Sequence, residues 1–238
     1  MCGPSSTGSP TVSFRWTGEF KIKAQDYYDA PGGVVIANPN APTGVLESRA
    51  FIEDIIKHNP GTVVIVDEAY IDFGGESVLP LIDRYENLLV VQTCSKSRSL
   101  AGLRIGFAFG SKNIIRYLKD ARFASNSYPM SRPQVAMGAA SFRDRAYFKD
   151  TTGKIIRTRE RVKEELRALG FTFPDSMTNF IFARHERLSG QEIFEALRAR
   201  GIYVRHWNKP RIEDYLRITI GTDEQMDTVI KALREIVG

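Results

Sequence analysis

Three short apolar runs, separated by helical patterns, constrain the fold more than any other feature of the chain. They lie at residues 34–37 (VVIA), 62–66 (TVVIV) and 88–92 (LLVVQ). Runs of β-branched and other apolar residues without alternation are typical of strands covered on both faces in a parallel sheet. An amphipathic pattern at 47–58 and a shorter helical segment at 79–85 separate them. This βαβ alternation predicts an α/β fold, with a mostly parallel sheet flanked by helices.

Each of the three runs ends in polar, chemically capable residues. The first is followed by the turn-forming cluster Asn38–Gly44 (NPNAPTG), the second by Asp67–Tyr70 (DEAY), and the third by Thr93–Lys96 (TCSK). Ligands of open α/β sheets bind at the carboxyl ends of the strands. The sequence therefore predicts a ligand site built from these three segments.

Lys96 is the residue in these segments with the most specific chemistry. A lysine amine can form a Schiff base with a carbonyl group, and Arg104, Thr93 and Ser95 can hold a phosphate. Pyridoxal phosphate carries both groups. This window alone is equally compatible with a surface lysine in a Ser-rich loop.

The remaining patterns divide the chain into three parts. Residues 1–18 are predicted to be an unstructured tail, 19–150 a large domain, and 151–238 a small C-terminal α+β domain. The additional strands are expected at 20–22, 105–109, 180–183, 202–205 and 215–220, the last three in a βαβ-like arrangement. The additional helices are expected at 113–122, 134–148, 151–169 (with Gly170 as its C-cap), 189–200 and 223–237.

Composition and charge exclude several classes of function. The net charge is +5 and the pI about 9.2, but Lys and Arg are scattered among acids, which argues against a nucleic-acid groove. No apolar run is long enough for a membrane span, and the N-terminus lacks the apolar region of a secretory signal. Cys2 and Cys94 give neither a disulfide framework nor metal-ligand spacing. We expect a cytoplasmic protein without a metal, a membrane or nucleic acid as partner.

Five motifs taken together resemble the fold-type I pyridoxal-phosphate-dependent aminotransferases (class I/II). They are Asn38–Gly44, Asp67–Tyr70, Ser95-Lys96, Arg104 and Arg217. Their order and spacing, from about Phe20 to the C-terminus, are most similar to the histidinol-phosphate aminotransferase group. The resemblance implies the PLP-transferase type I fold, a homodimer, and a place in histidine biosynthesis.

The implied reaction transfers the amino group of histidinol phosphate to 2-oxoglutarate, giving imidazole acetol phosphate and glutamate. A related lyase such as threonine-phosphate decarboxylase, which uses the same cofactor residues, is one alternative. A fragment without turnover is another.

The resemblance also assigns roles around the cofactor. Lys96 would bind the cofactor covalently and then act as the base that moves a proton. Asp67 would keep the pyridine nitrogen protonated, and Tyr70 would donate to the phenolic oxygen of the ring. Thr93 and Ser95, with Arg104, would hold the cofactor phosphate.

Further residues take subsidiary roles. Arg217 and Arg205 match arginines for the anionic groups of the substrate, although Arg205 could instead be a structural ion-pair partner. Arg98 is expected to face solvent, Cys94 to be a packing residue, and Asn179 to position the chain.

The sequence departs from the family pattern at two places. Relatives carry an asparagine directly before Pro-Thr-Gly, where this chain has Ala41, so Asn40 or Asn38 would reach the cofactor, or Tyr70 would act without either. Relatives also have a further N-terminal segment before the equivalent of Phe20. It contributes strands, a phosphate-binding Gly turn, a ring-stacking aromatic and a tyrosine lent across the dimer. We therefore expect an N-terminally truncated chain with an incomplete large domain and doubtful turnover on its own.

Overall fold

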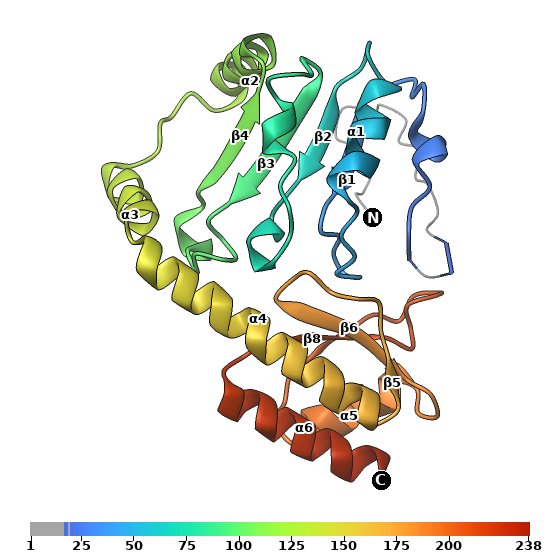
Figure 1. Cartoon of the computed structure of the whole chain (residues 1–238). Helices are drawn as coiled ribbons and strands as arrows, with labels where there is room; N and C mark the ends of the chain where they lie inside the picture. Colours follow the sequence, from blue (N-terminus) through green and yellow to red (C-terminus); the bar gives the residue numbers. More distant parts are fainter. Residues whose placement is uncertain (1–16, 19) are drawn as a thin grey trace.

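Two lobes, each built on its own four-stranded sheet, are joined by one long helix (Figure 1). The computed structural model describes residues 17–18 and 20–238. Almost all of the predicted tail, 1–18, therefore lies outside the described residues.

The sheet of the first lobe confirms the predicted α/β architecture. Its strands are ordered β1 (Val34–Ala37), β2 (Val64–Asp67), β3 (Leu88–Thr93) and β4 (Gly106–Gly110). The first three are parallel, and β4 is antiparallel to β3. The connection from β3 to β4 contains only the 3-10 turn η4 (Ala101–Leu103), whereas a parallel return would need a longer crossover.

Helix α1 (Arg49–Lys57) covers one face of this sheet. Ser48 caps it by accepting a hydrogen bond from the Phe51 amide at 3.2 Å. Its apolar stripe is buried against alternate residues of β1, β2 and β3, as the sequence pattern predicts. The stripe consists of Ile52, Ile55 and Ile56. The helix expected at 79–85 is only the 3-10 turn η3 (Leu79–Leu81).

The strand expected at 20–22 is wrong. Phe20 has φ of 60°, which is incompatible with an extended strand, and its ring packs edge-on against Phe182 and Tyr215 of the other lobe. Two further 3-10 turns belong to the first lobe: η1 (Ala24–Tyr27), shortly after Phe20, and η2 (Ile71–Phe73), after β2.

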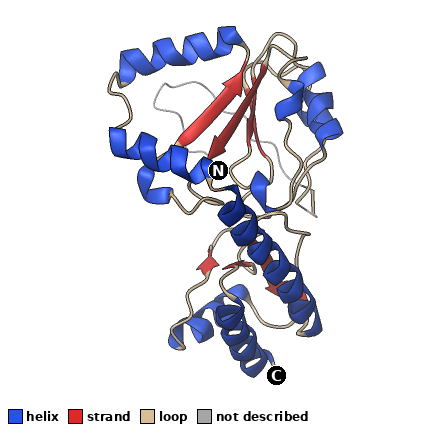
Figure 2. Ribbon diagram, turned by 60° about the vertical axis from the view of Figure 1, so that its left-hand side comes forward, coloured by secondary structure: helices blue, strands red, loops and turns tan. Residues whose placement is uncertain are grey.

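Three helices lead from the first lobe to the second: α2 (Lys112–Ser125), α3 (Arg132–Arg143) and α4 (Arg145–Ala168). The single helix expected at 134–148 is divided at Asp144, whose carboxylate caps α4 by accepting from the Tyr147 amide at 3.0 Å. Helix α4 includes residue 150, and a long helix extends into the second lobe in Figure 2. A domain boundary at 150 stays a prediction. Gly170, at φ of 81°, follows its C-terminus as predicted.

The second lobe is the small α+β unit that the sequence indicates, but its strands pair differently. The order is β5 (Phe171–Thr172), β6 (Phe180–His185), β8 (Leu216–Thr219) and β7 (Arg205–His206). Every pair is antiparallel, so the βαβ-like expectation is wrong. Helices α5 (Gly190–Ala199) and α6 (Asp223–Val237) pack with α4 around the apolar core of this sheet.

None of the helices in the described residues combines the length and the apolar character that a membrane span requires. Likewise, that part of the chain contains no cluster of His, Cys, Asp and Glu suited to a metal ion.

Strand β1 offers a direct test of which sheet face carries the core. Ile36 is 5% exposed and its neighbour Val35 is 63% exposed. We expect Ile36→Ala to lower the free energy of unfolding by about 2–5 kcal/mol, because it leaves a cavity under α1. Val35→Ala, the matched control, should cost at most about 1 kcal/mol. Urea unfolding followed by circular dichroism measures both, and equal losses would contradict the assignment of the buried face.

Candidate functional site

The carboxyl ends of β2 and β3 bring two of the predicted site residues together. Asp67 ends β2 and Thr93 ends β3, and Asp67 pairs in register with Val91. One carboxylate oxygen of Asp67 accepts a hydrogen bond from the Ala69 amide at 3.0 Å, which fixes the side chain at the strand end. The structure therefore places Asp67 and Thr93 at the ends of neighbouring parallel strands.

The loop after β3 presents Lys96 on the surface of the first lobe. The Ser95 amide donates to Thr93 Oγ1 at 3.1 Å, and the two hydroxyl oxygens of these residues lie 2.8 Å apart. Lys96 is exposed, and its Nζ lies 5.4 Å from the centre of the Tyr70 ring. Cys94 is fully buried, as expected for a packing residue, and burial raises the pKa of its thiol.

Arg98 does not face solvent, so that expectation is wrong. Its guanidinium carbon lies 3.8 Å from the centre of the Phe142 ring and 4.1 Å from that of Phe148. Its Nη1 donates to the Ser141 carbonyl at 2.7 Å. Aromatic faces attract a planar guanidinium, and the packing ties the Lys96 loop to α3 and α4.

Arg104 follows η4 in the left-handed conformation, with φ of 55° and ψ of 44°. A non-glycine residue there costs about 1 kcal/mol or more, and such residues cluster at active sites, ligand clamps and switch regions. Its Nη1 donates to the Ala101 carbonyl at 3.1 Å, and the side chain is otherwise exposed. The guanidinium is thus held next to the Lys96 loop without a carboxylate partner among the described residues.

The two candidate asparagines differ in whether the side-chain NH₂ group already has a hydrogen-bond acceptor. The Asn38 amide group donates to the Glu47 carbonyl at 3.0 Å and accepts from the Glu47 amide at 2.7 Å, so both its ends close the turn. Asn40 accepts from the Thr43 hydroxyl at 3.0 Å, and its NH₂ group has no hydrogen-bond acceptor in the described part of the chain. The geometry favours Asn40 as the residue that can donate to a ligand.

Glu68 is a residue whose role the sequence did not indicate. It is 1% exposed and accepts hydrogen bonds from the Val78 amide at 2.7 Å, the Ser77 hydroxyl at 2.6 Å and Gln92 Nε2 at 2.8 Å. A buried carboxylate needs such partners. Glu68 therefore fastens the strand end that bears Asp67 to β3.

The second lobe contributes two arginines. Arg205 on β7 lies directly opposite Arg217 on β8, and both guanidinium groups lie over the Trp207 ring, at 5.3 and 5.6 Å. Neither arginine forms an ion pair with a carboxylate anywhere in the described residues, so the structure gives no support to the ion-pair alternative for Arg205.

Arg217 Nε is the clearest sign of a missing partner. It is buried and, among the described residues, has no hydrogen-bond acceptor. Leaving a buried donor unpaired costs about 1–3 kcal/mol, and more for a charged group. An anionic ligand bound at Arg217 would supply the acceptor.

Two aromatic rings connect the halves of the site. The Tyr70 ring meets the Phe180 ring edge-on with centres 5.3 Å apart, and the Arg217 guanidinium lies 5.0 Å from the centre of Phe180. Lys96 Nζ lies 5.4 Å from the centre of the Tyr70 ring. The amine therefore lies beside one ring of an aromatic contact between the lobes, and the guanidinium lies beside the other ring. Sequence reasoning missed Phe180 and also Trp207, although an aromatic two residues after Arg205 was a usable signal.

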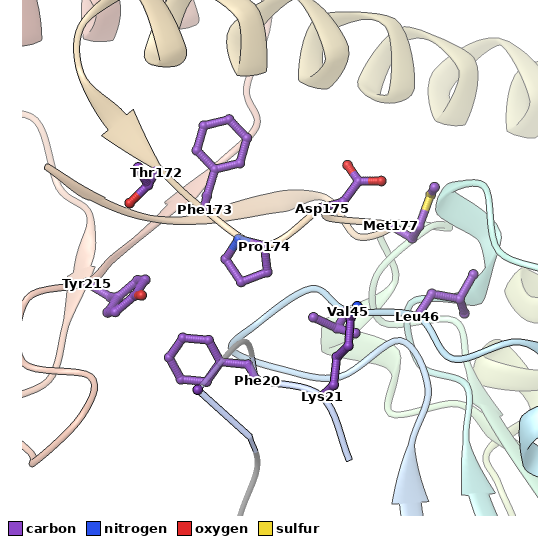
Figure 3. A pocket seen from close by; sticks show the side chains of 11 residues that line it. Phe20, Lys21, Val45, Leu46, Thr172, Phe173, Pro174, Asp175, Met177 and Tyr215 are labelled. Carbon is purple, nitrogen blue, oxygen red and sulfur yellow. The ribbon is translucent and has the colours of Figure 1, made fainter. Parts of the chain in front are cut away.

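A hollow of about 540 Å³ also lies between the lobes (Figure 3). Phe20, Val45 and Leu46 line one side, while Pro174 and Tyr215 line the other. None of the predicted site residues lines it. The chemistry of the strand ends, rather than this hollow, defines the candidate site.

Comparison with known proteins settles the family. Residues 6–233 match the family described as aminotransferase class I and II. The chain belongs to this family. A histidinol-phosphate aminotransferase from Lactococcus lactis subsp. cremoris (strain SK11) is 52% identical over 217 residues, covering 91% of this chain and 61% of that protein. The predicted resemblance to the histidinol-phosphate group is confirmed. The chain spans about three fifths of the length of the curated relatives it matches.

Solved structures agree on the fold. Histidinol-phosphate aminotransferase from Sinorhizobium meliloti, in complex with pyridoxal-5'-phosphate, superposes with a TM-score of 0.81 at 26% identity, covering 97% of this chain and 65% of that one. L-threonine-O-3-phosphate decarboxylase from Porphyromonas gingivalis gives 0.70 at 24%, covering 86% and 64%, and shares the fold alone. The predicted fold class, PLP-transferase type I, is confirmed.

Glu68 can be tested against an exposed acid nearby. We expect Glu68→Ala to lower the free energy of unfolding by about 2–4 kcal/mol, because it leaves buried donors unpaired. Glu76→Ala is the control, since Glu76 is 69% exposed and its ion pair with Arg49 lies on the surface. Thermal unfolding of the two variants side by side gives the comparison; an unchanged melting temperature for Glu68→Ala would refute the fastening role.

Proposed function

We propose that this chain holds pyridoxal phosphate and provides the catalytic amine of a histidinol-phosphate aminotransferase, which exchanges an amino group between histidinol phosphate and 2-oxoglutarate. One observation carries the proposal. An exposed lysine beside the Asp67 and Thr93 strand ends lies across an aromatic contact from Arg217, whose buried Nε has no acceptor among the described residues. The curated relatives carry the same activity in their names.

The residues of the first lobe fit the cofactor. The Asp67 carboxylate would keep a pyridine nitrogen protonated, while the Thr93 and Ser95 hydroxyls with Arg104 would bind the phosphate. When bound, the cofactor supplies a ring that accepts electrons from the substrate's Cα. Asn40 has the free donor to reach the phenolic oxygen of that ring.

Tyr70 and Lys96 would carry the proton chemistry. The phenol of Tyr70 would donate to the phenolic oxygen of the ring. Lys96 would attach to the cofactor's carbonyl carbon and, once released by the incoming amine, move a proton from Cα to the cofactor. Its exposed position in the loop gives the amine room for both tasks.

The arginines of the second lobe would bind the anionic groups of both substrates. Arg217 would give its unpaired Nε–H to a phosphate or carboxylate oxygen, and Arg205 would add a second charge beside it. Phosphate and carboxylate both suit the planar guanidinium fork. One site can therefore accept histidinol phosphate, 2-oxoglutarate and glutamate in turn.

The oligomer and the location complete the proposal. Homodimers are what the family resemblance implies, and we propose that this chain assembles in the same way. The free, buried Cys94 accords with the reducing cytoplasm, which we propose as its location.

Covalent attachment of the cofactor tests the assignment of Lys96. Incubation with pyridoxal phosphate, followed by borohydride reduction and peptide mass mapping, should show the added mass on the peptide that contains Lys96. Lys96→Ala should abolish this labelling. Lys112→Ala, which removes another exposed lysine, should leave it unchanged. Labelling spread evenly over surface lysines would contradict the assignment.

Substrate affinity tests the second lobe separately. In the cofactor-loaded protein, Arg217→Lys should weaken binding of histidinol phosphate about 10- to 100-fold, because a charge-assisted hydrogen bond is lost. Labelling at Lys96 should persist. Arg184→Lys is the matched control, since Arg184 lies on the same sheet with its guanidinium over Tyr215. Calorimetric titration measures the affinity, and equal weakening by both variants would refute a specific role for Arg217.

A further inference from the structure

Arg159, near the middle of α4, donates to the backbone of both lobes. Its Nη1 lies 2.8 Å from the Phe73 carbonyl oxygen in the first lobe and 2.9 Å from the Thr178 carbonyl oxygen in the second. The side chain is only 2% exposed. A single guanidinium nitrogen therefore connects two backbone segments that are distant in sequence.

These two segments carry the aromatic rings of the candidate site. Phe73 is the last residue of η2, which begins directly after Tyr70, and Thr178 lies two residues before Phe180. The Tyr70 and Phe180 rings are the pair that separates Lys96 from Arg217. A change in the distance between the two carbonyls would therefore move the segments that bear these rings.

Burial restricts which side chains can replace Arg159. Among the described residues, Arg159 forms an ion pair only with Glu160, which is half-exposed, at 2.8 Å, and its Nη2 lies 3.9 Å from Met177 Sδ. A buried cation is tolerated when its donors are all used, and the planar fork of arginine is what reaches several acceptors at once. A lysine amine of the same charge lacks that fork.

The surrounding contacts show that this is where the lobes meet. The Met177 amide donates to the Gly44 carbonyl at 2.9 Å, which is a second backbone link between the lobes. Gly74, at φ of 114°, ends η2 beside the guanidinium. Arg159 is thus at the centre of a small docking region rather than within the core of either lobe.

We propose that Arg159 is a positioning residue, which sets the spacing between Lys96 and Arg217 across the two lobes. The inference rests on the proposed function, because it assumes a ligand that engages both lobes. Such a ligand has a cofactor part near Lys96 and an anionic group at Arg217. A substitution at Arg159 should not change the affinity for a ligand that binds only to the first lobe.

Two ligands separate these cases by calorimetry. Pyridoxamine phosphate occupies the cofactor site alone, whereas the N-phosphopyridoxyl derivative of histidinol phosphate spans both lobes. Arg159→Lys should weaken binding of the spanning ligand tenfold or more, because the loss of its hydrogen bonds to Phe73 and Thr178 would release the spacing of the two lobes. It should change the affinity for pyridoxamine phosphate by no more than about twofold, the scatter for uncoupled sites.

Arg161→Lys is the matched control. Arg161 lies two residues further along the same helix and is bound by Glu165, Asp223 and Asp227, all within α4 or the second lobe. This variant should leave both affinities unchanged. Equal weakening of the two ligands by Arg159→Lys, or no change in either, would overturn the proposal. Arg159→Met, which fills similar space without burying a charge, takes the place of the lysine variant if that one does not fold.

A ligand-free measurement keeps the two proposals distinguishable. Hydrogen exchange at the Met177 amide, which bonds across the lobes to Gly44, should quicken at least tenfold in Arg159→Lys and stay unchanged in Arg161→Lys. If the unaltered chain binds neither ligand, the proposed function fails. In that case the exchange result alone decides whether Arg159 holds the lobes together, and unaltered exchange would overturn its role.

Discussion

The edge-on contact between Tyr70 and Phe180 is the interaction on which the candidate site depends. Each ring comes from a different lobe, and each lies next to one cation of the site, Lys96 on one side and Arg217 on the other. The contact places a surface suited to a cofactor beside a surface suited to an anion. Helix α4 continues from the first lobe into the second (Figure 1) and so connects the two lobes directly.

The two central cations of the site differ in their surroundings from the cations that form ion pairs with acids. Arg161 is a cation that acids neutralise: although burial alone would lower its pKa, the hydrogen bonds that it donates to Asp227, Asp223 and Glu165 raise it. Lys96 and Arg217, by contrast, have no carboxylate partner among the described residues. An anionic cofactor and an anionic substrate require cations that no carboxylate neutralises. Lys96 and Arg217 meet this requirement, and each lies beside one ring of the Tyr70–Phe180 contact.

The sequence could predict the parts of the site that depend on local pattern. The strand ends, the turn residues and the segment Thr93–Lys96 follow from periodicity and residue chemistry. For this reason the sequence could place Asp67 and Lys96 at the ends of neighbouring strands. The reversal of β4, the stacking of Arg98 and the inward turn of Phe20 depend on partners far away in the chain. No local pattern contains that information, because tertiary contacts override the preference of a short segment.

The central claim is that Arg217 Nε is kept for an anionic ligand that also engages the first lobe. Nuclear magnetic resonance of ¹⁵N-arginine-labelled protein tests it most directly, with the Nε–H signal of Arg217 assigned by its loss in Arg217→Lys. Our account predicts that the spanning phosphopyridoxyl ligand shifts this signal and slows its exchange with water, whereas pyridoxamine phosphate leaves it unchanged. An Arg217 Nε–H signal that changes with neither ligand, or changes equally with both, would contradict the account.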